Sequence, residues 1–211
     1  MSDLSQLKIA SLKSKVSAQE WAARVDLAAC YRLIAHYGMS DMVYNHVSAG
    51  FVIHSAVHKG RPDVGCVIHN HSIAGMAISA LDCGLLPITQ TAMYFDGVGM
   101  HEYESVAIDL DEQARLVRDL GTRKAMILRN HGLLAVGASV SEAFTNLFWL
   151  ERACQAQLAA MACNAKLHFP SREVIEKTNH LYRPETRRRW GPLEWPALLR
   201  LLDRRDPSFR E

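Results

Sequence analysis

The stretch "GCVIHNHSIAGMAISALDCG", residues 65–84, contains an apolar run that ends at two histidines and is followed by a segment of small residues. A short apolar run bounded by glycine is typical of a buried strand, and the small-residue segment is typical of a helix that ends at Gly84. His69 and His71 are two positions apart, and such residues point to the same side of a strand. The spacing therefore predicts two imidazoles directed at one point where the strand ends.

A second apolar run ends in a similar way. "KAMILRN", residues 124–130, predicts another buried strand, and "LLAVG", residues 133–137, predicts a strand that pairs with it after a turn at His131 and Gly132. Neighbouring strands would bring His131 beside the first two histidines. Three neutral imidazoles with an open position form a catalytic-type site for Zn²⁺ or a related divalent ion. Histidines that only form hydrogen bonds are the alternative, which the spacing leaves open.

Helix and strand patterns alternate along the rest of the chain. Capping-box patterns, S-x-x-E, at residues 17–20 and 139–142 predict the starts of two long helices. We expect further helices from residue 51 to Gly60 and at residues 109–121, and short strands at residues 43–48, 86–95 and 98–103. This alternation predicts an α/β fold with a central mixed sheet covered by helices.

Length and composition favour one compact domain over residues 1–211. Of the 211 residues, 49% are hydrophobic, which is enough for a substantial core. The tail at residues 170–211 carries five of the seven prolines and is expected to wrap the surface or a neighbouring subunit. Five cysteines, an odd number without a CxxC pair, predict reduced thiols in a reducing compartment.

Charge and hydropathy exclude several classes of partner. A formal net charge of +2 argues against nucleic-acid binding. The one basic cluster, "RPETRRRW" at residues 183–190, predicts a solvated helix face or a subunit contact, with an anion-binding patch as the alternative. The first 17 residues carry charges throughout and hold no apolar stretch long enough for a signal peptide or a membrane span. We therefore expect a cytoplasmic protein with no membrane contact.

Two motifs together resemble those of the class II aldolase/adducin domain family. They are "RPDVGCVIHNHSIAGMAISA", residues 61–80, and "AMILRNHGLLAVGASVSEAFTNLFWLERACQAQ", residues 125–157, and the resemblance extends over residues 25–161. The amino-acid sequence of the motifs is most similar to that of the bacterial adducin-like branch. The resemblance implies a three-layer α/β/α fold with a central mixed, largely antiparallel sheet. It also implies a homo-oligomer, with a tetramer favoured, whose site lies near a subunit interface.

The resemblance also implies a metal and a chemistry. In the family's L-fuculose-1-phosphate aldolases and L-ribulose-5-phosphate 4-epimerases, the histidines matching His69, His71 and His131 bind a divalent metal. Zn²⁺ is expected first, with Mn²⁺ or Co²⁺ as alternatives. The metal acts as a Lewis acid on the oxygens of a sugar phosphate or hydroxy-ketone, and a carboxylate moves the proton.

This chain departs from the family pattern in two places. Gly50 occupies the position of the catalytic Glu or Asp, and a glycine can neither bind a metal through a side chain nor transfer a proton. In addition, Ala49 is followed directly by Gly50, where relatives carry a few dozen residues that help to hold the substrate phosphate. Either the chain has lost that segment or this sequence omits it.

Four further residues are candidates for the site. The resemblance places His46 and His54 at the substrate pocket, with plain packing as the alternative for His54. Tyr94 and Tyr103 flank the region from which aldolases supply a tyrosine acid, and they are the candidates for proton transfer. A surface or interface role is the alternative for Tyr103.

Two functions remain in view. The three histidines favour a metal-dependent, class II aldolase-like lyase acting on a small hydroxy-carbonyl or sugar-derived substrate. Gly50 and the shortened segment favour a non-catalytic, adducin-like binding or assembly module. Actin or spectrin binding is not expected, because this chain has no long basic tail of the adducin kind.

Overall fold

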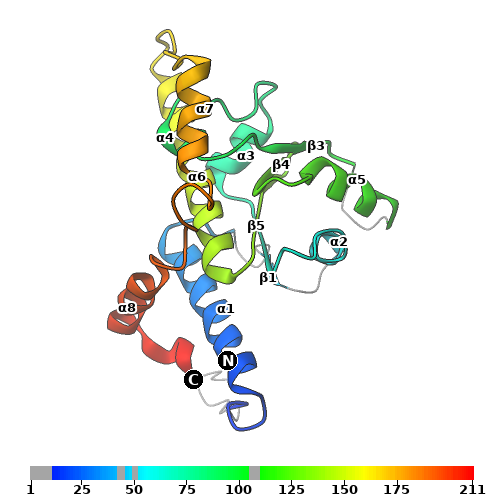
Figure 1. The fold of residues 1–211 in the computed structure, drawn as a ribbon, viewed down its shortest axis with the longest axis vertical. Helices are drawn as coiled ribbons and strands as arrows, with labels where there is room; N and C mark the ends of the chain where they lie inside the picture. The colour runs from blue at the N-terminus through cyan, green and yellow to red at the C-terminus, as the bar shows by residue number, and fades with distance from the viewer. Residues whose placement is uncertain (1–10, 42–45, 49–51, 105–109) are drawn as a thin grey trace, which may run out of the picture.

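The computed structural model describes residues 11–41, 46–48, 52–104 and 110–211. Their centre is a five-stranded sheet in the order β1-β2-β5-β4-β3 (Figure 1). β3 and β4 are parallel, and every other neighbouring pair is antiparallel. The prediction of a mixed, largely antiparallel sheet is confirmed. The strands are β1 His46–Ser48, β2 Cys66–Asn70, β3 Gly99–His101, β4 Ala125–Leu128 and β5 Gly132–Gly137.

Helices cover both faces of this sheet, as Figure 1 shows. Along β4, Ala125 and Ile127 join one apolar cluster with residues of α1, α3 and α6, whereas Met126 and Leu128 join another with residues of α2 and α5. This alternation makes the three layers of the predicted α/β/α fold. The helices are α1 Ala18–His36, α2 Val52–Gly60, α3 Ile73–Ser79, α4 Gln90–Met93, α5 Leu110–Leu120, α6 Val140–Ala162, α7 Arg172–Leu181 and α8 Trp195–Arg205, with a 3₁₀ turn at Pro207–Arg210.

The two long helices begin where their capping patterns predict. The Ser17 hydroxyl accepts a hydrogen bond from the Glu20 N–H at 3.1 Å, and the Ser139 hydroxyl accepts one from the Glu142 N–H at 3.3 Å. Each bond satisfies an amide that has no partner inside the helix. The same local chemistry therefore fixes the starts of α1 and α6, whose buried sides pack against each other.

One predicted strand is wrong. Residues 86–95 contain the helix α4 instead, and the Thr89 hydroxyl caps it by accepting a hydrogen bond from the Ala92 N–H at 3.2 Å. The alternating pattern of this segment resembled that of a strand, but a cap and tertiary packing outweigh a weak β propensity.

The tail forms helices and contributes to the core. Trp195, Leu202 and Phe209 are all buried in the cluster that also contains α1 and α6. The Trp195 Nε1–H donates to Asp26 at 2.9 Å, and Arg32 pairs with Asp206 at 2.6 Å. The tail therefore closes over α1 of the same chain.

Two further observations concern the cysteines and the apolar character of the helices. The five cysteines are free thiols, and Cys30, Cys66 and Cys154 are buried. Among the described residues, no helix has both the length and the apolar character that a membrane span needs.

Candidate metal centre

The first two histidines lie at the end of β2. Pairing with β5 places His69 opposite Leu134, and the strand alternates so that Val67 and His69 face the layer of α2 and α5. Ile68 lies on the opposite face, in the cluster with α1 and α6. His71 follows two positions after His69 and lies beside it, with 4.6 Å between the ring centroids. β2 ends at Asn70, so His71 lies one residue beyond the strand, yet its ring lies beside that of His69 as the H-x-H spacing predicts.

The third histidine is placed by the turn between β4 and β5. Asn130 has φ of 52°, a left-handed conformation that asparagine tolerates better than most residues. A Cβ on Gly132 would lie 2.4 Å from the backbone oxygen of Asn70, so only glycine fits against the end of β2. The His131 N–H donates to the Ser79 hydroxyl of α3 at 3.1 Å. Asn130 and Gly132 therefore suit the backbone of this turn, and the bond to Ser79 fixes the backbone of His131 between them.

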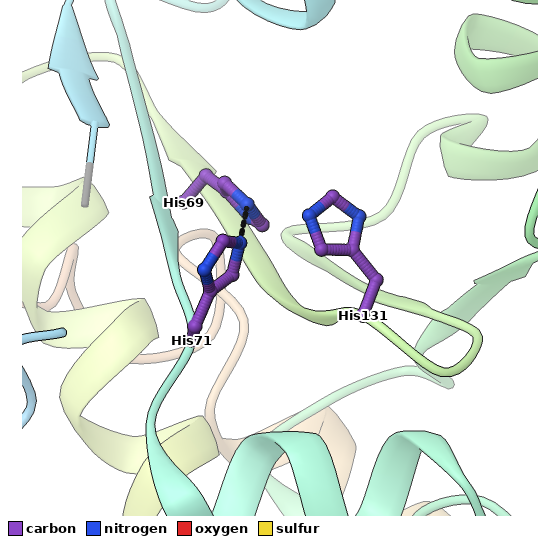
Figure 2. A group of neighbouring side chains, drawn as sticks. All are labelled: His69, His71 and His131. Atoms are coloured by element: carbon purple, nitrogen blue, oxygen red, sulfur yellow. Dashed lines mark hydrogen bonds between the residues drawn. The ribbon is translucent and has the colours of Figure 1, made fainter. Parts of the chain in front are cut away.

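The three imidazoles meet at one place (Figure 2). One potential ligand atom from each of His69, His71 and His131 lies within 4.8 Å of the others. The Nε2 atoms of His69 and His71 are 2.8 Å apart, and the His131 ring lies 4.7 Å from each of the other two ring centroids. The sequence predicted this meeting of residues from two motifs sixty positions apart.

The outer nitrogens of the β2 histidines have acceptors. His69 Nδ1 lies 2.9 Å from the carbonyl oxygen of Leu133, and His71 Nδ1 lies 3.4 Å from Oδ2 of Asp41. A carbonyl accepts only from a protonated nitrogen, so Nδ1 of His69 carries the hydrogen and its Nε2 keeps a lone pair. Histidine ligands of metals typically have this outer support from a carbonyl or a carboxylate. The two rings are thus oriented as ligands.

His131 is kept in the form that a metal requires. Burial, and secondarily the charge of His71, lowers the pKa of His131 from 6.5 to about 4. At neutral pH its imidazole is uncharged and has a free lone pair, as metal binding demands. A set of three imidazole donors suits Zn²⁺ and other borderline divalent ions.

Asp41 and Ser79 belong to this site, and sequence reasoning missed both. Asp41 lies in the segment after α1, thirty residues before His71, and Ser79 is the last residue of α3. Neither has a motif around it that marks a contact with a histidine. Only the packing of α1 and α3 against the sheet brings them there.

The two tyrosine candidates are separated by the fold. The Tyr103 ring lies 6.3 Å from the His131 ring, and Tyr103 is 53% exposed. Tyr94 is buried among aromatic residues, and its hydroxyl donates to Asn146 at 2.6 Å. Asn146 in turn donates to the carbonyl of Val136, near the end of β5 remote from His131. Of the two, Tyr103 is the one beside the histidines.

The remaining predicted positions are described only in part. His46 lies in β1 with its Cα opposite that of His69, and His54 lies in α2. Their side chains, together with Gly50 and the junction with Ala49, are outside the residues that the structure describes. Their predicted roles at the substrate pocket stay predictions.

Comparison with known proteins gives the family. Residues 46–158 match the Class II Aldolase and Adducin N-terminal domain. A Pseudomonas aeruginosa protein named for the aldolase class 2 group is 36% identical over 96% of this chain and 97% of its own length. The chain therefore belongs to the class II aldolase and adducin family. Mouse alpha-adducin is 34% identical over 66% of this chain, which corresponds to 26% of that adducin.

Solved structures show the same fold. An aldolase II superfamily protein from Pseudomonas syringae superposes with a TM-score of 0.87 at 38% identity, over 96% of this chain and 100% of that one. An L-fuculose 1-phosphate aldolase from Glaciozyma antarctica has a TM-score of 0.77 at 22% identity, over 97% of this chain and 96% of that one. The second likeness concerns the fold alone.

The relatives are longer inside the matched region. The alignment with the P. aeruginosa protein runs over 252 positions and covers 96% of a chain of 211 residues. That relative therefore carries residues without a counterpart here. Their number agrees with the few dozen that the motif comparison expects between Ala49 and Gly50.

Proposed function

We propose that His69, His71 and His131 hold one divalent cation, with Zn²⁺ expected first and Mn²⁺ or Co²⁺ as alternatives. The observation that carries this proposal is that the three rings converge on one place. His69 and His71 direct Nε2 toward each other and Nδ1 toward an oxygen on the outer side of the cluster. One buried and two half-buried imidazoles without such a role would be costly to keep together. The fit of the donor set supports a catalytic-type centre.

The proposed activity is that of a metal-dependent lyase on a small hydroxy-carbonyl compound. A bound divalent cation supplies Lewis-acid stabilisation of negative charge that develops on a substrate oxygen. The hydrogen bond to Leu133 fixes the tautomer of His69, and the Asp41 carboxylate holds the outer side of His71. Tyr103 is our candidate to hold or deliver a proton at its hydroxyl, and the 6.3 Å between its ring and that of His131 supports this choice.

The substrate class follows from what this chain lacks in sequence. Gly50 offers no carboxylate. The relatives carry extra residues that have no counterpart in this sequence, and the motif comparison expects them between Ala49 and Gly50, where the family holds the substrate phosphate. A hydroxy-keto acid or a similar chelating compound is therefore favoured over a sugar phosphate. The adducin relatives support a second function, a binding or assembly module that keeps the scaffold without the chemistry.

Exposed apolar residues near the centre support a homo-oligomer. Ile73 and Met76, one turn apart on α3, are 84% and 40% exposed, and they follow closely on His71. An apolar helix side of this kind is typical of a subunit contact. We expect light scattering at micromolar protein to report an assembly, with a tetramer favoured; a 23.6 kDa species alone would contradict this.

One experiment separates the two functions. Protein stripped with a chelator is reconstituted with Zn²⁺, Mn²⁺ or Co²⁺ and assayed for aldehyde release from a panel of hydroxy-keto acids and sugar phosphates. A lyase releases aldehyde only after reconstitution, and Tyr103→Phe lowers the rate while metal content stays the same. A binding module retains the metal but cleaves no member of the panel. Rapid cleavage of L-fuculose 1-phosphate would refute the preference for non-phosphorylated substrates.

A further inference from the structure

A second polar hollow lies at the end of the β4–β5 pair remote from His131. Residues 122–124, which lead into β4, and residues 136–138, where β5 ends, form two of its walls. The hollow has a volume of about 320 Å³ and adjoins another of about 170 Å³ that also includes residues 122–124. Pro184 lines both, so the C-terminal segment covers one side. This space is separate from the histidine centre.

Lys124 stands between these hollows without an acceptor. Its Nζ lies 4.2 Å from the centroid of the Tyr94 ring, and none of the described residues gives it a hydrogen bond or a carboxylate partner. The lysine is half-buried, and burial lowers its pKa from the ordinary value of 10.5. Glu142, Glu185 and Asp96 oppose that shift from a distance. The Tyr94 ring and these distant carboxylates do not replace the hydrogen bonds that the Lys124 ammonium group loses when it leaves water.

Of the other basic side chains that line the hollow, only some have a carboxylate partner among the described residues. Arg61 is already paired with Asp63 through two hydrogen bonds, at 2.8 and 2.7 Å. The guanidinium groups of Arg123 and Arg189 have no carboxylate partner within the described part of the chain. On the acidic side, Glu142 accepts from the Ala138 N–H, and Glu185 is exposed. Among the described residues that line the hollow, Lys124, Arg123 and Arg189 therefore lack a carboxylate partner.

We propose that this hollow binds a small molecule through an oxyanion group, a phosphate or a carboxylate, held by Lys124 with Arg123 and Arg189. Guanidinium forks and an ammonium group together match the oxygens of such an anion. The volume suits a small metabolite. Arg189 belongs to the basic cluster at residues 183–190, for which an anion-binding patch is the alternative that the sequence leaves open.

The native protein can be tested without any substitution. Acetylation by acetic anhydride is followed at each lysine by peptide mass spectrometry, with EDTA present and ionic strength held constant with chloride. We expect millimolar inorganic phosphate or succinate to slow the labelling of Lys124 several-fold and to leave the exposed Lys166 unchanged. Protection by phosphate alone identifies a phosphate ligand, and protection by succinate alone identifies a dicarboxylate. Protection by neither anion overturns the proposal.

Variants give an independent readout in the unfolding temperature. The anion that protects Lys124 should stabilise the wild-type protein, Lys124→Arg should keep part of this stabilisation, and Lys124→Met should abolish it. Lys166→Met is the matched control and should behave as wild type. His131→Ala should retain the effect, because the hollow is separate from the metal centre. A Lys124 that is protected without any anion, and becomes reactive on dilution, would show that a second copy covers the hollow and would overturn the proposal.

Discussion

Oδ2 of Asp41 lies 3.4 Å from Nδ1 of His71, and this contact joins the segment after α1 to the strand that carries the H-x-H motif. Nε2 of the same ring points to His69. A carboxylate behind a histidine fixes its ring and makes its inner nitrogen a better donor to a metal. We therefore expect Asp41 to raise the affinity of the three histidines for a metal, although it is not itself a predicted ligand.

Replacing Asp41 by alanine should weaken metal binding without unfolding the chain. We expect a loss of about 10–100-fold in affinity, the usual effect of removing an outer partner of a histidine ligand. Competition with a chromophoric chelator measures it. Asp82→Ala, at a fully exposed aspartate, is the matched control. Equal affinities in the two variants would mean that Asp41 does not support His71.

Removing a histidine of the cluster should remove the metal. His69→Ala or His131→Ala takes away one of three predicted ligands, and the remaining two imidazoles cannot hold the ion through purification. Elemental analysis of protein purified without chelator should give one ion per wild-type chain and close to none in either variant. His168→Ala, at an exposed histidine, should keep the wild-type content. Metal retained by both cluster variants would place the ion elsewhere.

Gly132→Ala should strain the junction of β2 and β5. The added methyl would lie 2.4 Å from the Asn70 carbonyl oxygen, so one of the two backbones must move. Overpacking of this kind lowers the free energy of unfolding by about 1–3 kcal/mol. Denaturant titration measures that loss, and metal content should fall with it because His131 is the adjacent residue. A variant as stable as wild type would show that the turn relaxes freely.

The turn at residues 188–194 of the C-terminal segment should weaken in acid. The Glu194 carboxylate accepts from Arg188 at 2.5 Å and from the Gly191 N–H at 2.9 Å, and these bonds lower its pKa below 4.5. Its contribution to stability is therefore complete above the unfolded pKa and disappears as pH falls through the lower, folded pKa. Denaturation followed by tryptophan fluorescence should show this loss in the wild-type protein.

Glu194→Gln provides the comparison for that titration. It should be less stable than wild type at neutral pH, because the charged hydrogen bonds to Arg188 are gone. Its stability should change less than that of wild type as the pH is lowered below 4.5. Parallel acid profiles of the two proteins would show that another group governs the transition.

Much of the fold could be predicted because its signals are local. Ser17 and Ser139 mark helix starts through bonds to amides three residues ahead, and the two-residue spacing of His69 and His71 predicts that their rings share one side. The segment at residues 86–95 was mispredicted for the converse reason. Its helix α4 depends on a single cap at Thr89 and on packing against α6 and α7. The packing cannot be predicted from the four residues of the helix, because α6 and α7 lie far along the chain.

Period, caps and motif spacing act over a few residues, so the sequence by itself predicted a mixed sheet covered by helices, the two long helices and the three histidines at strand ends. The three layers were implied by the family resemblance. Only the tertiary structure decided that β5 lies between β2 and β4, which brings His131 to the other two rings. It also decided that Asp41 supports His71 and that Lys124 faces a hollow beside Arg189. These contacts join segments far apart along the chain, and their formation depends on the packing of whole helices and strands, which no local pattern encodes.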